Sequence, residues 1–274
     1  MTTAYEYRET LLKVTGVSLI LGGQQILRDL SFEIRNIHRP TQNQGQVVAL
    51  LGPSGMGKTR LFHILAGLDP PDTGTVQVGP EGKPVQRGMV GVVAQSYPLF
   101  EHRTVLGNLL IAGRRAGLAT DQARAKANGL LQRFNLGAHG GKYPAQLSGG
   151  MRQRVAISQQ FMCSEHFLLM DEPFSGLDCV AIDEVIKLIG EVSTSDELNT
   201  TVVVTHDIAA AIEIADHIWL LGRDRDAGGN PVPGARIQAN FDLIERGLAW
   251  RDGISGEPAF HELLQEVRTR FATL

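Results

Sequence analysis

The stretch GPSGMGKT at residues 52–59 constrains this chain more than any other part of its 274 residues. It fits the pattern G-x-x-x-x-G-K-[ST] and follows the continuous apolar run 46–52, which is typical of a strand buried on both faces. Apolar residues then recur at helical spacing from Lys58 to Ala66. Such a pattern arises by accident in roughly one chain in a hundred of this size. Its place between a strand and a helix predicts a phosphate-binding loop in an α/β fold.

The residue types of this loop suit a nucleotide triphosphate. Its glycines let the backbone curl so that several N–H groups converge on phosphate oxygens, and the following helix presents its positive end to the same anion. Lys58 should reach the β- and γ-phosphates, and the Thr59 hydroxyl should ligate Mg²⁺. The residues expected to bind nucleotide here are Gly52, Pro53, Ser54, Gly55, Met56, Gly57, Lys58 and Thr59.

Two adjacent carboxylates end a second apolar run, FLLMDE at 167–172. Ligands gather at the carboxyl ends of parallel strands, so we expect Asp171 to hold Mg²⁺ through water. Glu172 should accept a proton from the attacking water or orient it. An acidic pair after a strand is, by itself, as often a solvated surface. Together with the loop at 52–59 it predicts a hydrolytic site.

Strands and helices alternate along most of the chain, which predicts a mainly parallel sheet covered on both faces. The N-terminal region differs, because two strands with period-two alternation over 11–34 flank a Gly22-Gly23 turn. The other expected strands are 88–95, 200–206 and 217–222, and the expected helices are 104–134, a segment after Gly150, and 257–271. The expected loops are 35–45 and 222–241, the second with a short strand.

Composition excludes several classes of protein. The net charge of −3 offers no basic field, so a nucleic-acid partner is not expected. Two cysteines, Cys163 and Cys179, are too few for a disulfide framework and lack metal-ligand spacing. No apolar run approaches the roughly 20 residues of a membrane-spanning helix, and the N-terminus carries no signal pattern. We therefore expect a reduced cytosolic protein that serves a membrane, if at all, from outside the bilayer.

The segment LSGGM at 147–151, followed by RQRVAIS, resembles the signature of the ATPase subunits of ABC transporters, whose usual form is LSGGQ. A serine-glycine loop that opens a helix is a second anion site without its own lysine. The resemblance covers about residues 10–222. It implies that two cassettes share nucleotides, with Ser148, Gly149 and Gly150 of one closing over the ATP of the other. Met151 departs from the usual glutamine and loses a side-chain hydrogen bond.

Three further motifs resemble those of the same family and occur in its order. Gln95 ends a strand and matches the glutamine that senses Mg²⁺ and water, which makes it a metal-binding and a catalytic candidate. Asp178 in SGLD matches the aspartate that reaches across the dimer. His206 ends the strand TTVVVTH and matches the histidine that contacts the γ-phosphate, so it joins Glu172 as a catalytic candidate.

Two places near these motifs leave a choice or depart from the family. The family stacks adenine on an aromatic residue, and the matching position here is Leu21, which offers apolar contact without π-stacking. After Gln95, the side chains of Tyr97, Leu99 and Phe100 suit a core and a surface that contacts a membrane partner equally well.

The resemblance implies an α/β P-loop NTPase of ABC type, with a mainly parallel central sheet, an antiparallel β subdomain and an inserted helical subdomain. The ATP-binding core with its N-terminal antiparallel subdomain is expected over 1–95 and 149–222. The helical signature subdomain is expected over 96–148. A C-terminal extension with a short strand and an amphipathic helix is expected over 223–274.

The implied function is that of an ATP-hydrolysing, Mg²⁺-dependent motor subunit, peripheral on the cytoplasmic face of the inner membrane. Its implied partners are transmembrane permease subunits, a second copy of itself or a paralogous cassette, and an extracytoplasmic substrate-binding protein. The overall sequence resembles that of importers of the nitrate, sulfonate and taurine branch, although lipid-trafficking and export systems use cassettes of this size too. Cargo and direction therefore stay open.

Two other functions compete with transport. A soluble ABC-type ATPase acting on nucleic acid or ribosomes is disfavoured by the acidic charge, the absence of a zinc pattern and the single cassette. Only about fifty residues separate Gln95 from Leu147, which leaves no room for a long coiled-coil insertion. A non-catalytic binding module is disfavoured because Lys58, Glu172 and His206 are all present.

Overall fold

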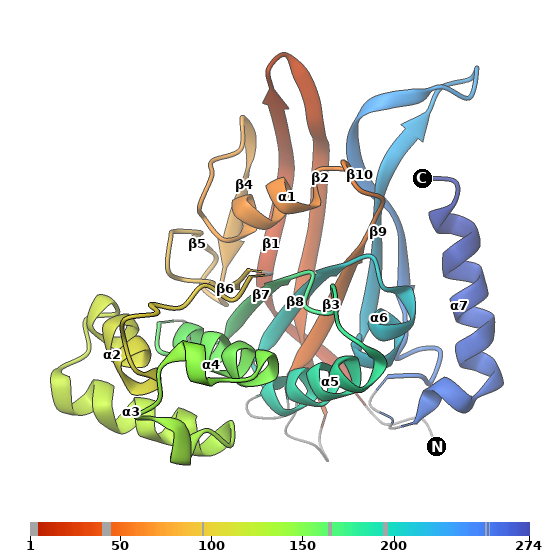
Figure 1. Cartoon of the computed structure of the whole chain (residues 1–274). Helices are drawn as coiled ribbons and strands as arrows, with labels where there is room; N and C mark the ends of the chain where they lie inside the picture. Colours follow the sequence, from red (N-terminus) through yellow and green to blue (C-terminus); the bar gives the residue numbers. More distant parts are fainter. Residues whose placement is uncertain are drawn as a thin grey trace.

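The computed structural model describes residues 5–39, 45–94, 96–163, 166–193, 197–249, 251 and 253–274. Within these residues one sheet runs through the molecule, with the strand order β5-β4-β1-β2-β10-β9-β3-β8-β7-β6 (Figure 1). Its parallel half comprises β9 (His217–Arg225), β3 (Gln46–Leu51), β8 (Thr200–Thr205), β7 (Phe167–Asp171) and β6 (Gly91–Val93). This arrangement confirms the α/β class and the mainly parallel central sheet.

The apolar runs become the central strands because both of their faces are covered. Every residue of β3 and of β8 is buried. Val48 and Leu50 of β3 pack on the side of α1 (Lys58–Leu65), whereas Ala49 and Leu51 pack on the opposite side. That opposite side is covered by α6 (Ile208–Ile214) and α7 (Pro258–Phe271). The strand therefore cannot shift by one residue without exchanging its two faces.

The antiparallel part of the sheet begins with a long hairpin of β1 (Glu6–Leu21) and β2 (Gln24–His38). Gly22 and Gly23 form its turn with φ angles of 57° and 78°, a conformation in which glycine carries no steric cost. The strands β4 (Thr73–Val78) and β5 (Lys83–Pro84) extend this side of the sheet. The expected turn is confirmed, but β2 continues to residue 38, so the first residues of the loop expected over 35–45 form a strand.

The helical region lies at one side of the sheet (Figure 1). It contains α2 (Val105–Arg115), α3 (Thr120–Arg133) and α4 (Gly149–Phe161), and α5 (Cys179–Ser193) packs beside α4. These helices share one apolar cluster with β7, centred on side chains such as Leu109, Phe134 and Ile157. The helices expected over 104–134 and after Gly150 are confirmed, while the strand expected over 88–95 is shorter, at 91–93.

The segment 222–241 is a long β-hairpin rather than the loop with a short strand that its composition predicts. β9 continues to Arg225, and β10 (Pro231–Asp242) pairs with it antiparallel, between β9 and β2 in the sheet. The prediction was wrong because Pro and Gly at the start of β10 hide a period-two pattern. Apolar residues alternate with polar ones over its second half, namely Ala235, Ile237, Ala239 and Phe241.

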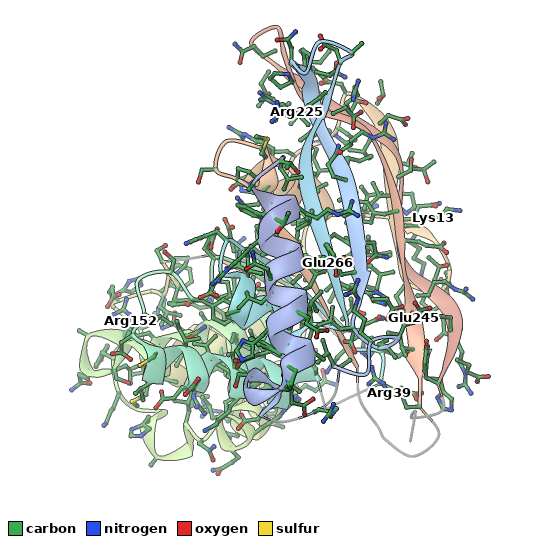
Figure 2. The ribbon with its side chains drawn as sticks, turned by 90° about the vertical axis from the view of Figure 1, so that its right-hand side faces the viewer. Lys13, Arg39, Arg152, Arg225, Glu245 and Glu266 are labelled. Atoms are coloured by element: carbon green, nitrogen blue, oxygen red, sulfur yellow. The ribbon has the colours of Figure 1, made fainter. Side chains whose placement is uncertain are left out.

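The C-terminal helix completes the core on this side. Figure 2 shows α7 lying along the β9–β10 hairpin, with Arg225 toward one end of the hairpin and Glu245 toward the other. Phe260, Leu263 and Val267 of α7 are buried against β9 and β10. The amphipathic helix is therefore confirmed. The segment beyond residue 222 shares the sheet and the core of the rest of the chain, and the boundary expected after residue 222 falls inside β9.

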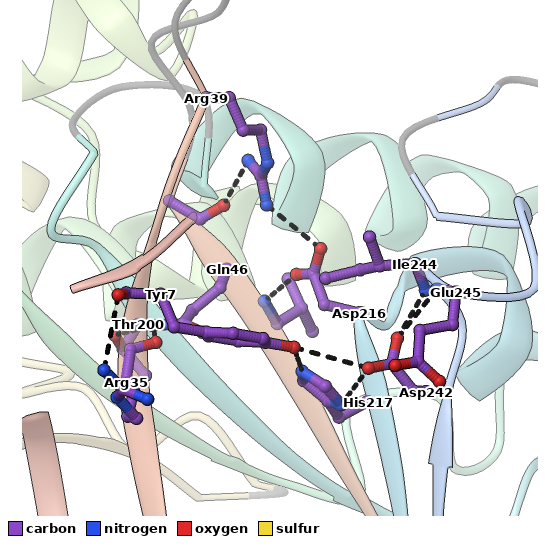
Figure 3. A network of polar contacts seen from close by, with 12 residues as sticks. Tyr7, Arg35, Arg39, Gln46, Thr200, Asp216, His217, Asp242, Ile244 and Glu245 are labelled. Atoms are coloured by element: carbon purple, nitrogen blue, oxygen red, sulfur yellow. Dashed lines mark hydrogen bonds and ion pairs between the residues drawn. The ribbon is translucent and has the colours of Figure 1, made fainter. Parts of the chain in front are cut away.

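A buried ion pair joins the amino-terminal ends of the parallel strands (Figure 3). The Arg39 guanidinium and the Asp216 carboxylate are 3.1 Å apart, with side chains that are 0% and 4% exposed. Asp216 also accepts a 2.6 Å bond from the Val47 backbone N–H, and Arg39 donates to the carbonyl of Gly45. These contacts fix the start of β3 against the start of β9.

None of the helices in the described part of the chain combines the length and the apolar character that crossing a bilayer requires.

Candidate functional site

The loop 52–59 connects the carboxyl end of β3 to the first turn of α1, as predicted. It is pressed between two strands, which explains two of its glycines. A Cβ atom on Gly52 would lie 2.5 Å from the carbonyl oxygen of Leu221, and one on Gly57 would lie 2.7 Å from a methyl carbon of Ile26. Gly57 also has a φ of 85°, a left-handed conformation that disfavours other residues. The loop can reach this shape only with glycine at these positions.

The side chain of Lys58 folds back over the loop. Its Nζ donates to the carbonyl oxygens of Gly52 at 2.6 Å and Pro53 at 3.1 Å, and the residue is only 9% exposed. Burial lowers the pKa of this amine, while the nearby charges of Glu172 and Asp171 oppose the shift. The partly buried ammonium group of Lys58, next to the exposed backbone of the loop 52–59, is suited to bind an anion. Ser54, Gly55 and Thr59 are exposed on the open side of the same loop.

The two carboxylates lie at the carboxyl end of β7, beside the end of β8. Asp171 pairs in register with Val204, and burial together with the charge of Glu172 raises the pKa of its carboxyl group. Glu172 adopts a φ of 48°, and its backbone N–H donates to the Val204 carbonyl at 2.8 Å. The electrostatic influence of both carboxylates on Lys58 places them near the loop, as the sequence predicts.

Glu172 and His206 are in direct contact. The Nδ1 atom of His206 lies 2.8 Å from Oε2 of Glu172, and the His206 side chain is 63% exposed, so its other ring nitrogen faces solvent. The Thr205 hydroxyl donates to the same oxygen at 3.3 Å. The sequence motifs point to Glu172 and His206 but not to Thr205. The one available signal was its place immediately before His206 at the end of a strand.

The donors available for a metal ion are oxygen atoms. The Thr59 hydroxyl and the Asp171 carboxylate are hard ligands of the kind that Mg²⁺ takes together with phosphate oxygens and water. Burial and the neighbouring charge of Glu172 raise the pKa of the Asp171 carboxyl group, and a bound cation would oppose that shift. These two residues fit Mg²⁺. The third predicted ligand, Gln95, lies outside the described residues.

The serine-glycine loop begins α4. Ser148 caps this helix by accepting a 3.3 Å bond from the Met151 N–H at its Oγ, and Ser148 and Gly149 are exposed. Met151 packs against the apolar cluster of the helical region. Figure 1 places α4, whose first turn holds Gly149 and Gly150, beside α2 and away from α1. The described residues do not bring these two anion sites together within one chain.

Two other predicted contacts with nucleotide are exposed. Asp178 caps α5 by accepting a 2.9 Å bond from the Ala181 N–H. Leu21, at the end of β1, is 40% exposed, next to Ile20 at 51%. Because β2 of the same hairpin contacts Gly57 through Ile26, the hairpin lies beside the loop 52–59. Leu21 is therefore on an element that borders the phosphate loop.

The three side chains of Tyr97, Leu99 and Phe100 differ in their surroundings. Tyr97 and Leu99 pack against the helical cluster, and the Tyr97 hydroxyl donates to the Pro173 carbonyl at 3.2 Å. Phe100 is 44% exposed and lies edge-on to His102. Two of the three are thus packing residues, and one lies on the surface.

Comparison with known proteins shows similarity to one family. The ABC transporter family matches residues 36–175. The sulfate/thiosulfate import ATP-binding protein CysA 2 of Rhizobium meliloti is 37% identical over 220 residues, which cover 77% of this chain and 57% of that protein. The CysA protein of Gloeobacter violaceus is 37% identical over 226 residues, covering 80% and 62%. The chain spans about three fifths of the length of these relatives.

Solved structures show the same fold. CbiO1 of Clostridium perfringens, described as part of the ABC transporter complex CbiONQ, superposes with a TM-score of 0.71 at 22% identity, covering 94% of this chain and 100% of that one. The ADP form of the ATP-binding cassette MJ1267 gives a TM-score of 0.68 at 20% identity, covering 90% and 98%.

Proposed function

The chain belongs to the ABC transporter family, and from this premise we propose that it is the ATP-hydrolysing motor subunit of a membrane transporter. One observation carries the proposal. At the carboxyl ends of adjacent parallel strands, a buried lysine lies over a glycine loop, and a carboxylate is held by a histidine beside it. This arrangement suits phosphoryl transfer to water, which depends on positioning and on electrostatic stabilisation.

Each group has a role that follows from its position. The backbone N–H groups of the loop 52–59 bind the phosphates, and Lys58 transfers its hydrogen bonds from loop carbonyls to phosphate oxygens. Glu172 orients the attacking water and accepts its proton, while His206 holds Glu172 and points its exposed ring nitrogen toward the γ-phosphate. Thr59 and Asp171 would hold Mg²⁺, which would neutralise charge on the phosphates when bound.

A second cassette completes the site. Ser148, Gly149 and Gly150 lie at the start of α4, where Ser148 and Gly149 are exposed, and α4 lies away from α1; this supports the use of the helix start on the nucleotide of a partner. Asp178 is exposed on α5 and suits the same interface. ATP binds better to the closed dimer than to the open one, and this difference drives closure. The partner cassette is a second copy of the chain or a paralogue.

The transported cargo is an oxyanion taken up by an import system. Two relatives that match this chain are named for sulfate and thiosulfate import, and the sequence is similar to the nitrate, sulfonate and taurine branch. Sulfate, thiosulfate, nitrate and sulfonates are small oxygen-rich anions, and taurine carries a sulfonate group. The chain attaches peripherally to permease subunits at the cytoplasmic face of the membrane, through the helical region that carries Phe100. An extracytoplasmic binding protein delivers the anion.

Replacement of Glu172 by Gln tests the hydrolytic role. We expect ATP to bind, hydrolysis to cease, and a closed dimer to accumulate that size-exclusion chromatography separates from the monomer. Glu262→Gln, on the exposed face of α7, is the matched control and should hydrolyse ATP like the wild type. Turnover by the Glu172→Gln protein at the control rate would overturn the assignment. Co-purification of ribosomes or DNA in place of a multi-spanning membrane protein would overturn the transport role.

A further inference from the structure

We infer that Thr205 is a positioning residue for the hydrolysis proposed above, on which this inference rests. Its hydroxyl holds one oxygen of the Glu172 carboxylate, so that the other oxygen is directed to the attacking water. Three consecutive residues, the last two of β8 and the one that follows it, contact the carboxylate or backbone of Glu172.

Glu172 is held at three successive points by the end of β8 and by the residue that follows it. Its backbone N–H donates to the carbonyl of Val204, and its Oε2 atom accepts from the Thr205 hydroxyl and contacts Nδ1 of His206. Glu172 has a φ of 48°, which non-glycine residues rarely adopt and which persists only where the surroundings over-determine it. β8 thus fixes both the backbone and the carboxylate of this residue.

The direction of the Thr205 bond follows from counting protons. A hydroxyl has one proton and two lone pairs. The Thr205 oxygen already accepts a 3.1 Å bond from the Asp207 backbone N–H, and its proton remains for Oε2 of Glu172 at 3.3 Å. Thr205 is 0% exposed, so solvent does not compete for that proton. The hydroxyl is therefore a fixed donor to the carboxylate.

Both side-chain donors use the same carboxylate oxygen. Thr205 and His206 meet Oε2, whereas Oε1 has no hydrogen-bond partner among the described residues. The Glu172 side chain is 18% exposed, so water can reach it. We assign Oε1 as the atom that receives the proton.

The reaction step balances with this assignment. As the water oxygen forms a bond to the γ-phosphorus, one water proton passes to Oε1 of Glu172, and the bond from that phosphorus to the bridging oxygen breaks with its electron pair staying on ADP. Thr205 and His206 keep Oε2 in place while Oε1 gains the proton. A carboxylate free to rotate would spend less time with a lone pair aligned on the water.

Substitution of Thr205 separates this role from folding. Thr205→Val keeps the shape and removes the hydroxyl, and Thr205→Ser keeps the hydroxyl and removes a methyl group. We expect kcat of the Val protein to fall about 10- to 100-fold, with the KM for ATP within about twofold of the wild type. The Ser protein should retain kcat within about threefold. Thr205→Ala offers the same comparison with less crowding if the Val protein folds poorly.

A matched control addresses the start of α6, because removal of the hydroxyl also takes an acceptor from the Asp207 N–H. Asp207→Ala removes the side-chain cap to the Ala210 N–H and leaves the Thr205–Glu172 contact in place. This protein should melt at a lower temperature than the wild type but keep its kcat.

The outcomes are distinguishable in assays of the purified full chain. Three results would overturn the role of Thr205. The first is a kcat of the Val protein within twofold of the wild type, and the second is a kcat of the Ser protein that falls as far as that of the Val protein. The third is a KM for ATP of the Val protein that rises by the same factor as its kcat falls. An Asp207→Ala protein with the same loss of kcat would overturn it too, because helix disruption would then explain the effect. A wild-type chain that hydrolyses no ATP would overturn the proposed function itself.

Discussion

The buried pair of Arg39 and Asp216 gives the sharpest prediction on stability, through the replacement Asp216→Asn. Burial lowers the pKa of the Arg39 guanidinium to about 10, although the Asp216 carboxylate favours the charged form. A depression of this size corresponds to about 3 kcal/mol against the charged form even with its partner in place. Removal of the carboxylate charge leaves Arg39 charged and 0% exposed in the interior.

The expected cost of Asp216→Asn is about 3–5 kcal/mol in the free energy of unfolding, the range for a buried pair that loses one member. For a chain of this size that corresponds to a fall in Tm of about 6–20 °C. The double variant Arg39→Met with Asp216→Asn removes both charges and should recover most of the loss, because an apolar side chain of similar length fills the site of the arginine without desolvating a charge.

Thermal and urea unfolding of the wild type, both single variants and the double variant make a double-mutant cycle. We expect a coupling of at least about 2 kcal/mol between the two positions. Additive effects, with a double variant that is less stable than either single one, would show that the two charges do not depend on each other. A single Asp216→Asn protein that unfolds like the wild type would refute the reasoning directly.

Three further outcomes concern the site and its surroundings. Lys58→Ala should weaken ATP binding about 100-fold in a fluorescent-nucleotide titration, while Lys83→Ala, an exposed lysine of β5, should bind like the wild type. Leu21→Trp should raise ATP affinity about two- to tenfold by stacking on adenine, and unchanged affinity would remove Leu21 from the site. Burial raises the pKa of Tyr97 to about 12, so its protonated phenol stabilises the fold fully below pH 10 and less as pH rises from 10 toward 12. Unfolding measured across that range should decline less steeply for Tyr97→Phe, and equal slopes would contradict this account.

Much of the local structure could be predicted because its causes lie in short contiguous runs. The order of strand, glycine loop and helix around 52–59 follows from an apolar run, from residues that permit a tight turn, and from helical spacing. The Gly22-Gly23 turn follows from two residues that accept positive φ. In each case the residues that specify the geometry are neighbours in the chain, so no knowledge of the tertiary structure was needed.

The features that escaped prediction depend on partners far away in sequence. Arg39 and Asp216 are 177 positions apart, and the sequence gives no sign that they meet. Thr205 and Glu172 are 33 positions apart and become neighbours only because β7 and β8 pair in parallel. β10 was not predicted for a related reason. Pro231, Pro233 and Gly234 are typical of a loop, and the strand forms because it pairs with β9.

The start of β3 contacts the stabilising ion pair, and its other end leads into the proposed catalytic loop. Asp216 fixes the strand at Val47, and the loop begins at Gly52, about 17 Å further along the strand at the usual rise per residue. Because β3 is buried on both faces, its packing keeps the register of the strand and the contacts of the loop when the ion pair is lost. Asp216→Asn should therefore lower Tm while the kcat of the remaining folded protein, measured at least 15 °C below its midpoint, stays unchanged. A fall in kcat at that temperature would mean that the ion pair also positions the phosphate loop.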